Sequence, residues 1–506
     1  MKPYTQSQDD VFTPVRLFLE SILSQLSSSD LPLQQQEVLL QTLGFVLFRM
    51  ILQALQDLRS AAEIPAPSLR GQDGLLRTEH KDSLRSVLTT FGTIHVSRIS
   101  YAARTLSSLH PLDAQLQLPA DSFSYSLRFR VAFSAIRCSF EETIEEIQRH
   151  TGATVGKRQA ELLCVRMAQD VSDFYQERSS HPWPQNQEER ECPVLVLSFD
   201  GKGIPMHTID LREETREKAM KKERSDRPSS AAEKNNRKRM AQVATVYVVG
   251  RYNRSVWQFL GLAENEANTD DCRPKPKRKR VWASVKRDPS AVMDEAFCEA
   301  KARDPEYKKV WVVLVDGSNA QLEAIRKRAK QEQNAPKIVY ILDFIHVSEY
   351  IWSAASALFP GKNVEAQGWA EKRIQEVLQG KACQIAARME QTATRMGLRG
   401  SRKEAVERSA SYICKHEGMM DYEKWLEQGL PIATGVIEGT CRYLVKDRME
   451  RTGARWRLVT AEAILQLRSV WASGDWDAYC QFHLQKEFER NHLSKFHPQE
   501  HHRFAA

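Results

Sequence analysis

Three short apolar runs along the chain each lead to an aspartate. The runs cover residues 194–199, 310–315 and 338–342, and the aspartates are Asp200, Asp316 and Asp343. Short continuous apolar runs bounded by turn residues predict strands buried on both faces, because a half-exposed strand would alternate apolar and polar positions. Glycines follow Asp200, so we expect the first strand to end in a bend there. In open α/β sheets ligands gather outside strand ends, which makes the three aspartates the main functional indication.

The elements between these runs indicate a fold class. Apolar patterning predicts a hairpin over residues 243–249 and 255–260, and helices over 284–302 and 319–331. The order is therefore strand, hairpin pair, helix, strand, helix, strand, helix, which is the order of the α/β ribonuclease-H-like fold. Residues 347–429 are helical throughout, too long for a connection inside a compact sheet domain. We expect a catalytic domain over 191–350 and 431–470, with an all-α insertion at 351–430.

Helical spacing from residue 11 to about 58 predicts a helical N-terminal region, 1–64, that serves packing or dimerisation. Residues 65–82 carry Pro, Gly and charge and are interpreted as a linker, and 91–101 as a short hairpin. At the other end, 471–506 is expected to form a C-terminal helix and a tail that frays from residue 487.

A helix-turn-helix is predicted at about 139–170, within a DNA-binding region at 83–185. Ser139 and Glu142 fit a capping box for the first helix, and Gly152 is expected to supply the bend. The alternative is an ordinary helical hairpin. The residues that open the second helix and are predicted to contact DNA are Lys157, Arg158 and Gln159.

Charge is informative only where it clusters. The chain of 506 residues has 73 basic and 65 acidic residues, a net charge of +8. Residues 212–239 hold 11 basic and 6 acidic residues with little apolar content and are interpreted as a solvated excursion. Residues 273–280 hold six basic residues, and two prolines exclude a helix. Such a segment suits a phosphate backbone, with a solvated loop as the alternative. The predicted contacts are Lys277, Arg278 and Arg280.

Cysteine use and hydropathy bear on the compartment. Nine scattered cysteines include no Cys-x-x-Cys pair, which argues against a disulfide framework and a zinc ribbon. No basic segment followed by an apolar one begins the chain, and no run of 18 apolar residues occurs. We expect a soluble cytoplasmic protein without a membrane partner, associated with the nucleoid when bound to DNA.

The carboxylates suggest metal-ion chemistry. Phosphodiester cleavage and strand transfer use two divalent ions about 4 Å apart, and hard cations take carboxylate ligands from rigid elements. Asp200 and Asp316 are the predicted first two ligands, and Glu438, on the first turn of a later helix, is the third. The alternatives are turn residues for the aspartates and a helix-dipole acid for Glu438. Asp343 is expected to cap a helix or support the site rather than bind metal, and His346 lies either beside the metals or in the core.

At these residues the sequence resembles the bacterial DDE transposases of the ISKra insertion-sequence type, in the Mutator-like group. The resembling stretches are 198–204, 315–318, 341–350 and, most specifically, 433–453 with Arg455 and Trp456; similarity over 112–161 extends the match. The resemblance implies that Asp200, Asp316 and Glu438 form the catalytic triad, and that Asp343 and His346 form an Asp-x-x-His motif. Relatives often carry Cys-x-x-Cys pairs, which are absent around residues 101–104, so a zinc-ribbon DNA reader is not expected.

The resemblance also implies a mechanism and partners. The triad would hold two Mg²⁺ ions, replaceable by Mn²⁺, and act on double-stranded DNA at transposon ends and targets, as a homodimer or larger assembly. Stacking of Trp352 or Trp369 on an extruded base is one interpretation, and a position in the buried core is the favoured one. The predicted phosphate contacts are Arg442, Lys446, Arg448, Arg451 and Arg455. Two alternatives are a nuclease that cuts without joining and a DNA-binding regulator derived from a transposase.

Overall fold

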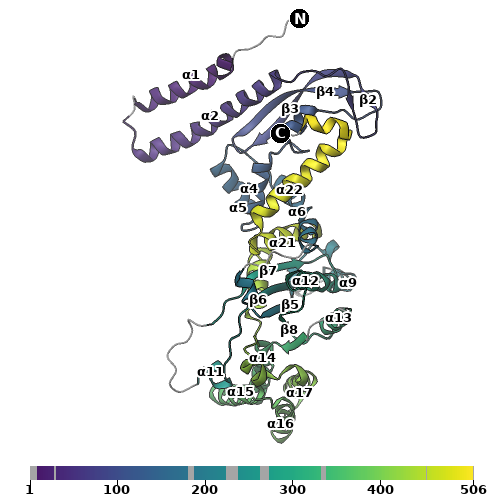
Figure 1. The fold of residues 1–506 in the computed structure, drawn as a ribbon. Helices are drawn as coiled ribbons and strands as arrows, with labels where there is room; N and C mark the ends of the chain where they lie inside the picture. Colours follow the sequence, from purple (N-terminus) through teal and green to yellow (C-terminus); the bar gives the residue numbers. More distant parts are fainter. Residues whose placement is uncertain are drawn as a thin grey trace. The chain divides into compact units, whose positions relative to one another are not determined.

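The structure is a computed structural model that describes residues 8–27, 30–180, 187–223, 237–262, 273–331, 338–451 and 453–504. The chain forms two compact units (Figure 1). The first comprises Met1–Phe174 with Asp475–Ala506, and the second comprises Tyr175–Gly474. The predicted C-terminal region therefore folds with the N-terminal part of the chain. Residues 224–236 of the predicted basic excursion lie outside the described residues, and α9 (Glu213–Glu223) precedes them.

The first unit begins with two helices, α1 (Gln8–Ser27) and α2 (Leu33–Ala61), and α2 packs on both α1 and β4. Two antiparallel pairs follow: β1 (Leu69–Arg70) with β2 (Leu76–Arg77), and β3 (Glu79–Thr89) with β4 (Gly92–Ala102). The prediction of a linker over 65–82 is therefore wrong from residue 69 onward. Residues 91–101 form one strand of a longer hairpin because β3, although largely polar, pairs with β4 along its whole length.

Among the described residues α2 is the one helix that is long and apolar enough to cross a membrane, with a mean hydropathy of 1.8 over its most apolar window. A helix in the core of a soluble protein meets the same criterion. Only 6% of that window is buried in the unit.

Helices α3 (Pro111–Gln115), α4 (Tyr125–Ala135), α5 (Phe140–His150), α6 (Lys157–Ala168) and α7 (Val171–Ser179) follow. The predicted capping box is confirmed, since Ser139 Oγ accepts from the N–H of Glu142 at 3.1 Å and Glu142 Oε2 accepts from that of Ser139 at 2.7 Å. Gly152 lies in a bend between α5 and α6, as predicted, and it has a second role, because a Cβ there would lie 2.6 Å from the carbonyl oxygen of Phe91. The glycine allows the α5–α6 connection to approach the β3–β4 turn.

The first unit is completed by α22 (Trp476–Asn491), η5 (Leu493–Lys495) and η6 (Pro498–Arg503). The prediction that this segment frays is wrong. Phe496 and Phe504 are buried together with Leu69 and Tyr101. The sequence predicts fraying because many residues of the segment are charged or histidine, although these two phenylalanines pack into the core.

The second unit contains a five-stranded sheet in the order β7-β6-β5-β8-β9 within the described residues. Strand β5 pairs antiparallel with β6 and parallel with β8, β7 pairs antiparallel with β6, and β9 pairs parallel with β8. This order and these directions are compatible with a ribonuclease-H-like fold. The strands are β5 (Val194–Pro205), β6 (Lys238–Val249), β7 (Lys277–Ser284), β8 (Val310–Val315) and β9 (Ile338–Leu342).

Two strand predictions need correction. Residues 255–260 are not a strand: Ser255 caps the short helix α11 (Val256–Phe259), and the edge strand is the basic segment β7. Strand β5 also continues past Asp200 to Pro205, paired with β6. Its partner on the other side, β8, ends at Val315. Asp200 therefore lies where β5 extends beyond β8 rather than at a strand end.

Helices pack around this sheet (Figure 1). Helix α12 (Pro289–Arg303) packs against β5, β6 and α13 (Asn319–Ala329), and α21 (Leu458–Ala472) packs against β7. Between β9 and α19 the chain is helical: α14 (Phe344–Leu358), α15 (Asn363–Leu378), α16 (Ala382–Arg395), α17 (Gly400–Lys415), η3 (Glu417–Met419) and α18 (Tyr422–Glu427). Then α19 (Gly435–Thr440), the π-helical turn η4 (Cys441–Lys446) and α20 (Asp447–Met449) return to the sheet. Smaller elements are α8 (Gln187–Arg190) and η1 (Thr208–Asp210).

Candidate active site

A cavity of about 170 Å³ lies where β5, the end of β8, the start of α14 and α19 meet. All three predicted catalytic carboxylates line it, together with both predicted supporting residues. The lining residues are Phe199, Asp200, Asp316, Asp343, Ile345, His346, Glu349, Thr434, Ile437 and Glu438. Residues more than 230 positions apart in sequence thus share one small space.

Asp200 is held from two sides. Its Oδ1 accepts from the N–H of Gly201 at 2.6 Å, and its Oδ2 accepts from the Cys441 thiol at 3.0 Å. Burial, and then the charge of Asp200, raise the pKa of that thiol, so Cys441 remains a donor. Sequence reasoning missed Cys441. The available signal was its spacing, three residues after Glu438 on the same helical segment.

Asp316 follows β8 in a turn. Its Oδ1 accepts from the N–H of Ser318 at 2.8 Å, and its carbonyl oxygen accepts from the Tyr412 hydroxyl of α17 at 2.7 Å. Burial, and the negative charge of Asp200, raise the pKa of the Asp316 carboxyl. Two carboxylates that repel each other in a half-buried space are the arrangement that a bound cation relieves.

Asp343 is 1% exposed, and both of its carboxylate oxygens form hydrogen bonds within the protein. It caps α14 by accepting from the N–H of Ile345 at 3.1 Å, and it accepts from both the N–H and the hydroxyl of Thr434. His346 Nδ1 lies 2.8 Å from Asp343 Oδ2. Burial opposes ionisation, yet the bonds to His346 and Thr434 lower the pKa of the Asp343 carboxyl. In turn, the bond to Asp343 raises the pKa of His346 to about 9.

Glu438 lies in the first turn of α19, and its side chain is exposed at the cavity. Three carboxylates on separate elements give the oxygen donors that hard divalent cations bind. The oxygens of Asp200, Asp316 and Glu438 do not all lie within 4.8 Å of one another, whereas one other trio in the described chain does. Ligands shared between two ions about 4 Å apart need not converge on one point.

That other trio lies in the first unit: Asp170, His483 and Glu487. Its carboxylates are already paired with two arginines. Glu487 accepts from Arg128 at 2.9 Å and Asp170 accepts from Arg490. Cations of the protein itself thus occupy the ligand oxygens, and the cluster is an ion-pair network that joins α22 to α4.

Two predicted phosphate contacts are wrong because the side chains are buried. Arg280 is 2% exposed, bonds to Glu299 at 2.7 Å and to Glu295, and lies over the Tyr175 ring at 3.6 Å. Arg448 is also 2% exposed, with its guanidinium 4.8 Å from the centre of the Trp456 ring. Neither guanidinium is accessible to a DNA backbone.

Other predicted contacts are partly engaged within the protein. Lys277 and Arg278 are half-buried, and Arg278 lies 3.3 Å from Glu189. Lys157 pairs with Glu141, and Gln159 Oε1 accepts from the N–H of Gly156 at 2.9 Å. Lys157 and Gln159 are nevertheless exposed, as are the predicted contacts Arg158, Arg442, Lys446, Arg451 and Arg455.

The two tryptophans differ. Trp352 is 39% exposed on α14. Trp369 is half-buried, with its ring centre 6.4 Å from that of Phe359 and beneath Arg373. Only Trp352 offers substantial free surface for stacking.

Comparisons with known proteins add little to this geometry. No family profile matches the sequence, and no curated protein matches it. The resemblance to ISKra-type or Mutator-like transposases therefore rests on the motifs alone. Among solved structures the chain is similar to the Drosophila P element transposase strand transfer complex, with 11% identity and a TM-score of 0.25, covering 76% of this chain and 86% of that one. At this score the similarity carries no argument about function.

Proposed function

We propose that this protein is a metal-dependent DDE transposase that cleaves and joins DNA. One observation carries the proposal: Asp200, Asp316 and Glu438 line one cavity at a sheet whose strand order is compatible with a ribonuclease-H-like fold. The sequence motifs that resemble ISKra-type transposases contain the same three residues.

In this proposal Asp200 and Asp316, fixed by backbone N–H groups, and Glu438, carried by α19, would hold two Mg²⁺ ions. Bound there, the ions would supply activation of an attacking oxygen and stabilisation of the leaving 3′-oxygen. His346, with a pKa of about 9, is protonated at neutral pH and places a positive charge at the cavity wall, suited to a phosphate. Asp343 keeps that imidazolium in position.

The DNA partner is double-stranded, and paired-end chemistry requires at least two copies of the chain. Helix α6, through the exposed Arg158, is proposed to contact the transposon ends. The exposed basic residues that follow Glu438 in the chain are proposed to contact phosphates beside the cavity. They are Arg442, Lys446, Arg451 and Arg455.

The test is cleavage and joining of DNA carrying the ends that flank the native gene, with Mg²⁺ or Mn²⁺, by the wild type and by Glu438→Gln. The matched control is Glu365→Gln, an exposed first-turn glutamate of α15 outside the cavity. We expect the wild type and the control to cut and join, and Glu438→Gln to bind DNA but do neither. Cutting without joining would identify a nuclease, and equal activity of all three proteins would refute the triad.

A further inference from the structure

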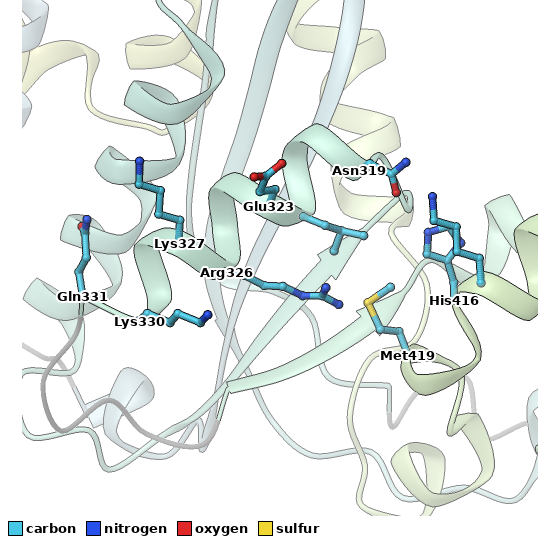
Figure 2. A pocket seen from close by; sticks show the side chains of 10 residues that line it. Asn319, Glu323, Arg326, Lys327, Lys330, Gln331, His416 and Met419 are labelled. Carbon is cyan, nitrogen blue, oxygen red and sulfur yellow. The ribbon is translucent and has the colours of Figure 1, made fainter.

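A second cavity, the basic trough, lies between α13 and the end of α17 with η3, and it has a volume of about 620 Å³ (Figure 2). It shares no residue with the carboxylate cavity. Figure 2 shows Arg326 extending from α13 toward Met419 on the opposite wall. The trough is lined by Asn319, Leu322, Glu323, Arg326, Lys327, Lys330, Gln331, Lys415, His416 and Met419.

Four cations line the trough against a single carboxylate. Arg326, Lys327, Lys330 and Lys415 are all exposed, and none has an ion pair with another residue that the structure describes. Like charges gathered around one hollow repel one another unless an anion lies between them. The trough therefore has the charge of a polyanion site.

His416 gives an independent indication of a ligand. Its side chain is 5% exposed, and its Nδ1 lies 2.8 Å from the carbonyl oxygen of Tyr412. Its Nε2 is buried at the trough without a hydrogen-bond partner among the described residues. Because Nδ1 faces a carbonyl oxygen, it carries the proton of the neutral ring and Nε2 is an unpaired acceptor. A buried acceptor left unpaired is unfavourable, and a donor on a bound ligand, such as the amino group of a nucleic-acid base, would satisfy it.

The trough continues into an adjoining hollow of about 420 Å³. The two share Arg326, Lys415, His416 and Met419, and the second adds the aromatic side chains of Tyr340 and Trp425. A lining that combines cations with aromatic side chains is the pattern by which proteins hold nucleic-acid strands, through phosphates and base faces.

We propose that the basic trough binds the phosphodiester backbone of a nucleic-acid strand at a site separate from the carboxylate cavity. Two joined hollows suit an extended strand better than a single nucleotide. The proposal rests on the proposed function in taking DNA as the ligand. The trough is also linked to the carboxylate cavity. The ring centres of His416 and Tyr412 are 4.8 Å apart, and the Tyr412 hydroxyl donates to the carbonyl oxygen of Asp316.

The trough variant carries Lys327→Gln and Lys330→Gln. The control variant carries Lys362→Gln and Lys372→Gln, which remove the same charge from two exposed lysines, one just before α15 and one within it. Binding of a labelled single-stranded oligonucleotide to the full chain is measured in EDTA over a range of salt concentrations. Removing one lysine that binds a phosphate lowers the slope of log Kd against log salt by about 1, so the slope of the trough variant should fall by about 2. The control should keep the wild-type slope.

An equal slope for both variants would overturn the proposal, even if the wild type cleaves DNA. If the wild type fails to cleave while the slope falls in the trough variant, the trough stands and the transposase proposal fails. Binding of a nucleoside triphosphate is measured in the same way. The strand proposal is overturned if the triphosphate binds the wild type more tightly than the oligonucleotide does and only triphosphate binding falls in the trough variant. The ligand would then be a nucleotide.

A direct readout is a photo-crosslinking amino acid placed at Asn319, an exposed residue of the trough, and at Lys372 as the control position. Crosslinks to the oligonucleotide from Asn319 and none from Lys372 are expected. Equal crosslinking from both positions would contradict a defined strand site.

Discussion

The Asp343 carboxylate accepts hydrogen bonds from both the backbone N–H and the hydroxyl of Thr434. Asp343 follows β9, and Thr434 precedes α19, the helix of Glu438. The helical insertion separates the two residues by 91 positions. This pair therefore fixes the proposed third catalytic residue to the sheet that carries the other two.

Removing the Thr434 hydroxyl should loosen that attachment. Thr434 is 4% exposed, so Thr434→Val leaves a buried carboxylate short of a donor and should lower the free energy of unfolding by about 1–3 kcal/mol. Metal-dependent cleavage should fall as well, because Glu438 loses its position. Thr434→Ser keeps the hydroxyl and should retain most of both. Urea unfolding and DNA cleavage check this, and equal behaviour of the two variants would show that the hydroxyl contributes nothing.

The part of the site built on parallel strands is predictable from sequence. Strand β8 is almost wholly buried and the end of β9 is buried too, so both appear as uninterrupted apolar runs, and the aspartates after them fall at the same sheet edge. The contacts that hold those aspartates are not predictable. Tyr412 and Thr434 reach these aspartates from segments far along the chain, and no local pattern marks such distant contacts.

Replacing Asp316 by Asn should stabilise the metal-free protein at neutral pH. Burial and Asp200 raise the pKa of the Asp316 carboxyl, so its ionised form is less stable in the folded chain than in the unfolded one. The gain should vanish below the unfolded pKa of about 3.9, where the carboxyl is neutral in both states.

Metal ions should make the wild type more stable than Asp316→Asn. Mg²⁺ at about 100 times its Kd should stabilise the wild type by about 2.7 kcal/mol and Asp316→Asn much less. Thermal unfolding with EDTA and with Mg²⁺ measures both effects. An unchanged Mg²⁺ response in the variant would exclude Asp316 as a ligand.

The pair of His346 and Asp343 should make stability depend on pH in the alkaline range. The pKa of His346 is raised to about 9 in the folded chain, above the unfolded value of about 6.5. Its contribution is therefore fully present below pH 6.5 and is lost as pH rises through about 9. In EDTA, the urea midpoint of the wild type should fall over this window more than that of His346→Gln. His207→Gln, an exposed histidine of the same unit, should follow the wild type.

Strand β7 shows why a charge run can mislead. Its basic residues predict a solvated or DNA-bound segment, yet Arg280 is neutralised by Glu295 and Glu299, 15 and 19 residues further on in α12. A basic run appears solvated in the sequence when the acidic residues that pair with it are not among its near neighbours in the chain. Only the packing of α12 over the sheet brings them together.

Arg280→Ala should therefore unfold the protein rather than weaken a DNA contact. Glu299 is 1% exposed, and Arg280 and Arg303 together lower the pKa of its carboxyl against the effect of burial. Loss of one partner leaves a buried charge undercompensated, at a cost of about 3–5 kcal/mol. Lys275→Ala, an exposed residue of the same basic segment, should change stability by less than about 0.5 kcal/mol. Urea unfolding distinguishes the two variants. A stable Arg280→Ala protein that binds DNA weakly would instead support the original prediction that Arg280 contacts a phosphate.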